Sequence, residues 1–171
     1  MSGFRFFASA AFVIALADIF LPTGAAHAAE PEAAVSGPLT QALAESMAQR
    51  CLSEARSKGW PAFTIAVVDV SGSLVLLRRQ DTAAAVTAEV AALKAKSAVR
   101  TGAPTQALAT MGQDPPTRDL FLLLQLTDDP GGLPIRMNGR VVGAIGVSGG
   151  TADQDIGCAT AASGALPAEK K

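Results

Sequence analysis

The side chains that most often carry out catalysis are scarce in this chain. It has a single histidine, His27, and no tyrosine. A serine or cysteine nucleophile needs a neighbouring base, which is commonly a histidine. His27 lies in a segment that we expect to be removed, so Ser71 and Ser148 lack a histidine base. The sequence therefore excludes a hydrolase of the serine–histidine or cysteine–histidine type, and we assign no catalytic residue.

The carboxylates form no recognisable catalytic pair. The candidates are scattered along the chain, at Asp69, Asp81, Asp128, Asp129, Asp153 and Asp155. Hydrolysis by paired carboxylates requires two groups held about 5 to 9 Å apart, and nothing in this spacing pairs them. We interpret them as solvated residues of turns and helix caps.

A glycine-rich segment, GVSGG at 146–150, precedes a predicted helix start. Backbone N–H groups at such a point can hold an anion. The segment lacks the lysine of a phosphate-binding loop, and Thr151 and Gln154 have the spacing of a capping box that would occupy the helix start. A tight turn is therefore favoured over an anion site.

The N-terminal segment is typical of a secretory signal. Arg5 provides a positive start, residues 6–16 form a short uncharged apolar run, and Ala26-His27-Ala28 has the small-x-small pattern of a cleavage site. The apolar run is shorter than the about 20 residues of a membrane span. We expect cleavage after Ala28 and a periplasmic or secreted protein, the alternative being an uncleaved N-terminus. The expected parts are a signal peptide at 1–28, a flexible lead-in at 29–38, one domain at 39–166 and a tail at 167–171.

The pattern of the mature segment predicts one α+β domain. It indicates helices at 39–59, 83–100 and 151–166, a short helical turn at 104–108, a Pro-rich loop at 112–117, and strands at 63–70, 74–79, 133–137 and 140–148. Asn138-Gly139 is a strong hairpin signal, and two hairpins predict a largely antiparallel sheet covered by helices. Gly143 and Gly146 predict close approach of a helix or backbone. Residues 120–126 (LFLLLQL) fit either a strand or a helical turn, and we favour a strand.

The charge pattern argues against nucleic acid and membrane surfaces. The formal net charge is −1, and basic and acidic residues are interspersed without a basic stripe. Lys96 and Arg100 are four residues apart on one predicted helix, which is typical of a solvated face. Lys94, on the same helix, points elsewhere.

The segment from Gly131 to Ala161 (GGLPIRMNGRVVGAIGVSGGTADQDIGCATA) resembles the closing signature of the GlcG/HbpS family, a haem-binding-protein-like domain also found in PduO proteins. Segments 64–72, 91–98 and 104–108 match earlier parts of that pattern in order, so the resemblance spans 39–166. It implies a profilin-like fold, an antiparallel sheet packed with helices, assembled into homo-oligomers. It also implies, as for some members of the family, that haem or a related tetrapyrrole is the ligand and cofactor.

The matched motifs propose a set of ligand-binding residues: Lys94, Ser97, Thr105, Gly131 and Gly132. Lys94 lies among alanines, where it is a candidate to meet a carboxylate, either a haem propionate or a small organic acid. Simple exposure of this lysine is the alternative. The residues that ligate haem iron are commonly His, Met, Cys or Tyr. The sequence assigns no axial ligand, and Met111 is a weak candidate for the metal.

Three functions follow from these observations. The first is an exported binding protein for haem or a related tetrapyrrole, acting in storage, delivery or sensing. The second is a haem-degrading or redox enzyme, although the chain has no flavin or nicotinamide fingerprint. The third is an accessory protein of an exported dehydrogenase without a small ligand. The absence of self-contained catalytic groups favours the first.

Cys51 and Cys158 are a candidate disulfide, because an even pair of cysteines in an exported chain is often bridged. The fold implied by the resemblance places the first and last helices side by side. Two separate buried thiols are the alternative.

Overall fold

The computed structural model describes residues 39–166, so the expected signal peptide, lead-in and C-terminal tail lie outside the described residues. The elements are α1 (Gln41–Ser57), β1 (Thr64–Asp69), β2 (Leu74–Arg79), α2 (Thr87–Thr101), the 3₁₀ turns η1 (Thr105–Leu108) and η2 (Met111–Gln113), α3 (Pro115–Leu123), β3 (Gly132–Met137), β4 (Arg140–Ser148) and α4 (Ala152–Ser163). The α+β class expected from the sequence is confirmed.

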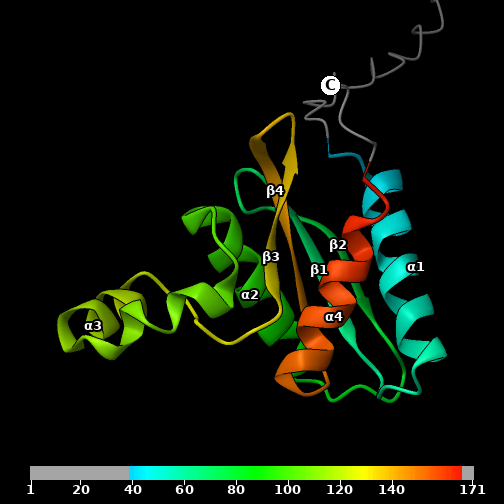
Figure 1. The fold of residues 1–171 in the computed structure, drawn as a ribbon, viewed down its shortest axis with the longest axis horizontal. Helices are drawn as coiled ribbons and strands as arrows, with labels where there is room; N and C mark the ends of the chain where they lie inside the picture. Colours follow the sequence, from blue (N-terminus) through cyan, green and yellow to red (C-terminus); the bar gives the residue numbers. More distant parts are fainter. Residues whose placement is uncertain (1–38, 167–171) are drawn as a thin grey trace, which may run out of the picture. The chain divides into compact units, whose positions relative to one another are not determined.

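The four strands form one antiparallel sheet in the order β2-β1-β4-β3 (Figure 1). Helices α1 and α4 pack side by side on one face of it, and α2 covers the other face. The two hairpins, β1–β2 and β3–β4, are joined in the centre by the pairing of Thr64 with Ser148 through Asp69 with Gly143. At the turn between β3 and β4, Asn138 and Gly139 both have positive φ, which confirms the expected hairpin turn.

Strand β1 is buried along almost its whole length because helices cover both of its faces. Ile65 and Val67 face the α1–α4 side, where they join the larger core. Ala66 and Val68 face α2 and meet Ala91 and neighbouring small residues of that helix. This two-sided burial explains why the strand has a continuous apolar sequence rather than an alternating one.

Asp69 closes the turn between β1 and β2. Its Oδ1 accepts hydrogen bonds from the Ser71 hydroxyl and from the N–H groups of Ser71 and Ser73. The hydrogen bond from the Ser71 hydroxyl is the main cause that lowers the pKa of the Asp69 carboxyl below its usual value. This carboxylate therefore has a structural role, as the sequence suggested.

The sheet and α2 approach each other closely at Gly146 of β4. A Cβ atom at this position would collide with the carbonyl oxygen of Ala91 and would lie 2.6 Å from the backbone nitrogen of Ala95. Only glycine lets the helix backbone approach the strand this closely. The expectation of close helix approach at Gly146 is thus confirmed.

We predict that Gly146→Ala lowers the free energy of unfolding by about 1 to 3 kcal/mol, because the added methyl group forces the backbone of α2 away from β4. Gly112→Ala is the matched control, since the nearest atom to its added Cβ is the side-chain oxygen of Asp128 at 3.3 Å. Chemical denaturation of both variants measures the difference. Equal midpoints for the two would show that the packing at Gly146 is not close.

The strand favoured at 120–126 is wrong: residues up to Leu123 belong to α3. Asp114 caps this helix by accepting a hydrogen bond from the N–H of Thr117, and Pro115 stands at its first position, where a missing N–H is harmless. The predicted Pro-rich loop at 112–117 therefore contains the start of a helix. Leu122 and Leu123 are 72% and 79% exposed, so the run of leucines is not a buried strand.

The second helix begins at Thr87, four residues later than the expected start at Ala83. The Thr87 hydroxyl contacts the Thr64 hydroxyl of β1 and donates to the carbonyl of Ala84, while Arg79 donates to the carbonyl of Ala83. These bonds hold the preceding residues in turns against the sheet. Within the described range, no helix combines the length and apolarity needed to cross a membrane.

Candidate functional site

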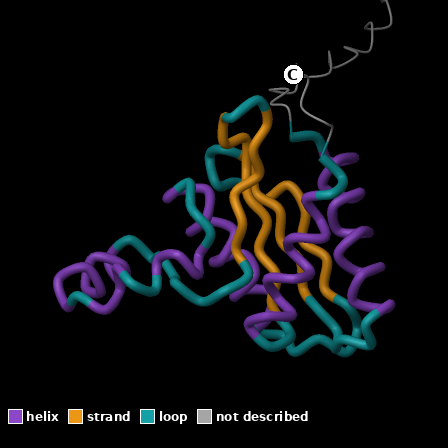
Figure 2. Tube along the Cα trace, viewed as in Figure 1, coloured by secondary structure: helices purple, strands orange, loops and turns teal. Residues whose placement is uncertain are grey.

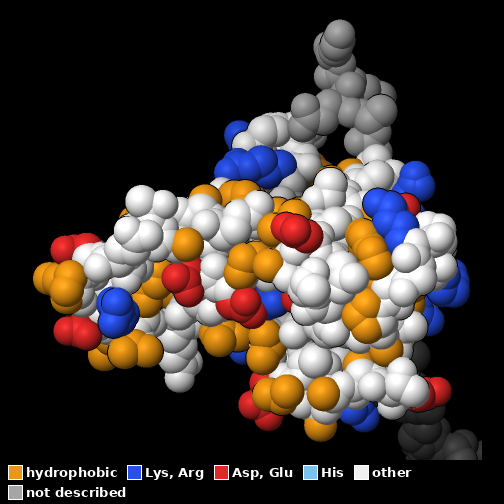
Figure 3. Space-filling model, turned by 60° about the horizontal axis from the view of Figure 1, so that its bottom comes forward, with side chains coloured by type: hydrophobic (Ala, Val, Ile, Leu, Met, Phe, Trp, Pro, Cys, Tyr) orange, Lys and Arg blue, Asp and Glu red, His pale blue; other side chains and the backbone are white. Residues whose placement is uncertain are grey.

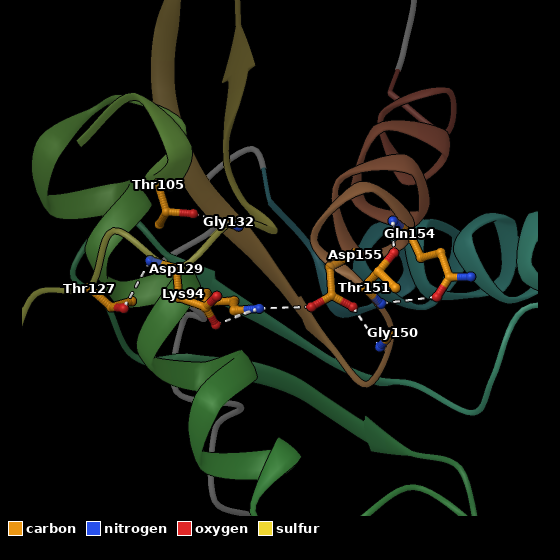
Figure 4. A network of polar contacts seen from close by, with 9 residues as sticks. All are labelled: Lys94, Thr105, Thr127, Asp129, Gly132, Gly150, Thr151, Gln154 and Asp155. Atoms are coloured by element: carbon orange, nitrogen blue, oxygen red, sulfur yellow. Dashed lines mark hydrogen bonds and ion pairs between the residues drawn. The ribbon is translucent and has the colours of Figure 1, made fainter. Parts of the chain in front are cut away.

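The most buried charged residue in the described part of the chain is Lys94 of α2, which is only 1% exposed. Its Nζ lies 2.8 Å from Oδ2 of Asp155 in α4 and 2.9 Å from Oδ2 of Asp129, which precedes β3 (Figure 4). The Asp155 side chain is 5% exposed and that of Asp129 is 53% exposed. Lys94 therefore links α2, α4 and the chain entering β3.

These contacts correct two interpretations. Lys94 is buried rather than exposed, and the carboxylates that it contacts belong to Asp129 and Asp155 of the same chain rather than to a ligand. Asp155 is not a solvated cap residue, because it lies on the inward face of α4 with Cys158, Ala159 and Ala162. Its spacing with those residues is the signal that sequence reasoning missed, since an acid within an apolar stripe requires a partner.

The start of α4 is satisfied by its own side chains. The expected capping box is present: the Thr151 hydroxyl accepts from the N–H of Gln154, and the Gln154 side chain accepts from the N–H of Thr151. Asp155 Oδ1 accepts from the N–H of Gly150 at 2.9 Å. The carboxylate of Asp155 thus takes the position an external anion would occupy, which agrees with a tight turn rather than an anion site.

Burial raises the pKa of the Asp155 carboxyl above its ordinary value. The hydrogen bonds from Lys94 and Gly150 and the charge of Lys94 oppose this rise, and the negative charge of Asp129 adds to it. The carboxylate is held in place by its partners, but it is poorly solvated.

The structure brings Gly131, Gly132 and Thr105, which come from separate matched segments, next to Lys94. The N–H of Gly132 donates to Oγ1 of Thr105 at 3.0 Å. Added Cβ atoms would lie 2.9 Å from Cβ of Asp155 at Gly131, and 2.5 Å from the carbonyl oxygen of Lys94 at Gly132. The two glycines therefore allow β3 to pass close to the ion pairs.

Ser97 is connected to this cluster through Thr127, whose Oγ1 accepts a hydrogen bond from the N–H of Asp129. Ser97 is buried on α2, and its hydroxyl accepts from the N–H of Thr127. Met111 stands on η2 and is 55% exposed. The described residues contain no group of three or more His, Cys, Asp or Glu side chains placed to hold a metal ion.

A separate hollow of about 570 Å³ lies between α2 and the projecting α3. Figure 2 shows this helix projecting from the sheet domain on a long connection. The sequence does not predict this hollow, because its apolar pattern favours a strand at 120–126, where the structure has the end of α3. It is lined by Glu89, Ala92, Leu93, Lys96, Arg100, Phe121, Leu122, Gln125 and Leu126.

Cys51 of α1 and Cys158 of α4 are joined by a disulfide, with Cα atoms 4.5 Å apart. Both residues are fully buried between the two helices. The side-by-side packing of α1 and α4, implied by the resemblance, brings the two cysteines together.

A family model described as "Haem degrading protein HbpS-like" matches residues 39–163, which covers the sheet and all four α-helices. The chain belongs to the GlcG/HbpS family. Its curated relatives include protein GlcG of Escherichia coli K12, 34% identical over 110 residues, which are 64% of this chain and 81% of GlcG. A second is an uncharacterised 15.0 kDa protein encoded between dhaT and dhaS in Citrobacter freundii, 36% identical over 123 residues, 68% of this chain and 84% of that protein.

Two solved structures share the GlcG/HbpS fold of this chain. The crystal structure of HbpS has a TM-score of 0.69 and 32% identity, and the match covers 75% of this chain and 90% of HbpS. The crystal structure of a PduOC:haem complex also has a TM-score of 0.69, with 24% identity, and covers 77% of this chain and 99% of PduOC. At that identity the second likeness supports the fold alone.

Haem, the group that the family description implies, combines a flat apolar ring, carboxylates and an iron ion. The hollow between α2 and α3 fits the first two, because apolar side chains line it beside Lys96 and Arg100. The iron has no comparable match among the described residues. Met47 is buried in the core and both cysteines are bridged. Met111 and Met137 do not line the hollow.

Proposed function

We propose that this protein is exported and binds haem or a related tetrapyrrole, in storage, delivery or sensing. The observation that carries the proposal is membership of the HbpS-like family over residues 39–163. The amphipathic hollow between α2 and α3 supports it as a place with the size and lining of a ligand site.

Export is supported by the signal-like pattern of Arg5, the apolar run at 6–16 and Ala26-His27-Ala28. A mature protein beginning at Ala29, found by mass spectrometry in the periplasm or medium, is the expected result. Recovery of the intact precursor alone from the cytoplasm would reject export. The homo-oligomer implied by the family stays a prediction.

We expect hemin to bind the naturally processed protein saturably, with a stoichiometric change in its Soret absorbance. The physical reason is burial of the apolar ring against apolar side chains, with the carboxylates held by cations at the surface. The titration is compared with a protein of similar size that does not bind haem. A Soret change no larger than that of the control would reject the proposed function.

The family description also favours a second candidate, haem degradation. That activity needs electrons from an external reductant, because the chain has no flavin or nicotinamide fingerprint. Incubating the hemin complex with ascorbate separates the two. Loss of the Soret band with a tetrapyrrole product indicates an enzyme, and unchanged haem indicates a binding protein.

A further inference from the structure

The hollow between α2 and α3 has two chemically different walls. One wall comes from α3 and the residues after it, and is largely apolar: Phe121, Leu122 and Leu126. The other is a single face of α2, where Glu89, Leu93, Lys96 and Arg100 follow at helical spacings of three and four. Figure 3 shows hydrophobic side chains gathered over the projecting α3, next to scattered charges.

The charges along α2 are ordered. The acid, Glu89, stands near the start of the helix, whereas Lys96 and Arg100 lie toward its end. A ligand with an apolar body and anionic groups at one edge matches this order, since its carboxylates would meet the two cations and its body the leucines. Charge-assisted hydrogen bonds from Lys and Arg to carboxylates are among the strong ones in proteins.

Arg100 connects the two walls of the hollow. Its Nη1 donates to the carbonyl of Leu124 at 2.6 Å, which ties the end of α2 to the end of α3. Gln125, the next residue, has a positive φ of 51° and turns the chain back so that Leu126 reaches the hollow. One hydrogen bond leaves further N–H donors of the guanidinium for a ligand.

We propose that this hollow is the tetrapyrrole site, with ring carboxylates on Lys96 and Arg100 and the ring against Phe121, Leu122 and Leu126, and that binding requires no protein ligand to the metal. The inference rests on the proposed function and adds its location and chemistry. The described residues that line the hollow include no His, Cys, Met or Tyr, the side chains that commonly ligate haem iron. The volume of about 570 Å³ lies within the range of small-molecule sites.

The test uses the naturally processed protein with two ligands, hemin and metal-free protoporphyrin IX. Binding is followed by Soret absorbance for hemin and by porphyrin fluorescence for protoporphyrin. We expect the two dissociation constants to agree within about threefold, because apolar contact and carboxylate pairing do not involve the metal. Hemin binding without measurable protoporphyrin binding would overturn the inference, since it would require ligation of the iron.

Two variants, each with a matched control, test the location. Lys96→Glu reverses a charge of the hollow, and Arg140→Glu reverses an exposed charge outside it. Leu122→Asp places a charge on the apolar wall, whereas Leu123→Asp places one at the next residue, which is similarly exposed but does not line the hollow. We expect Lys96→Glu and Leu122→Asp each to raise the dissociation constants of both ligands about tenfold or more. The dissociation constants of the two controls should stay within about threefold of those of the unchanged protein.

The outcomes separate this inference from the proposed function. If the unchanged protein binds neither ligand, both fail. If it binds both and all four variants bind equally well, the protein is a tetrapyrrole binder whose site lies elsewhere, and the inference alone fails. Circular dichroism of each variant checks that it is folded, and the substituted side chains are exposed in the structure.

Discussion

Removing the bridge between Cys51 and Cys158 is expected to lower the free energy of unfolding by about 4 to 5 kcal/mol. The two cysteines are 107 residues apart in sequence, so the bridge closes most of the described domain into one loop. In the chain-entropy model a loop of this length strongly restricts the unfolded chain and leaves the folded one unchanged. The effect is of the same order as the whole stability of a small domain.

The measurement compares guanidinium unfolding of the protein, purified without reductant, with that of Cys51→Ala/Cys158→Ala. Treating both proteins with reductant is the matched control. Reductant should lower the free energy of unfolding of the bridged protein and leave that of the double variant unchanged. Thiols are counted beforehand on the denatured, unreduced protein. Two reactive thiols per chain would show that the bridge is absent in the protein.

Replacing Lys94 with methionine is expected to lower the free energy of unfolding by about 3 to 5 kcal/mol at neutral pH. Methionine fills much of the space of the lysine stem but leaves Asp155, 5% exposed, without its cation. The carboxylate then keeps only the N–H of Gly150 as a partner. Asp129 loses an ion pair too, but its 53% exposure lets water replace the lysine.

Lys96→Met is the control for this prediction, because Lys96 lies on the same helix but is exposed. Its effect should stay within about 0.5 kcal/mol, as is usual for surface positions. Adding Asp155→Asn to Lys94→Met should recover part of the loss, because no unpaired buried charge remains. Equal stability of Lys94→Met and Lys96→Met would contradict an ion pair that matters to folding.

The same network predicts a pH dependence for Lys94→Met. Burial already raises the pKa of Asp155 with the lysine present, and removing the lysine takes away its main opposing partner. A carboxyl whose pKa is raised in the folded state favours folding at low pH, and this contribution is lost as the pH rises through the raised value. The stability difference between the protein and the variant should therefore narrow as the pH falls toward the ordinary pKa of aspartate.

The sequence determined those parts of the fold whose causes are local. Asn138 and Gly139 specify their own turn, because both adopt positive φ more readily than most residues do. Thr151 and Gln154 specify the start of α4, because the two halves of a capping box lie three residues apart. Strands β2 and β4 were located with the observed bounds, since turn residues border their apolar runs.

The structure decided whatever depends on residues distant in sequence. Nothing near Asp155 in the sequence shows that its cation is Lys94, 61 residues earlier, because only the tertiary fold places α2 and α4 on either side of the start of β3. The secondary structure of residues 120–126 could not be assigned from the local sequence, since a run of seven mostly apolar residues fits a strand or a helix equally well. The hollow depends on that assignment. It exists because Asp114 and Pro115 begin a helix there and Arg100 fastens the end of that helix to α2.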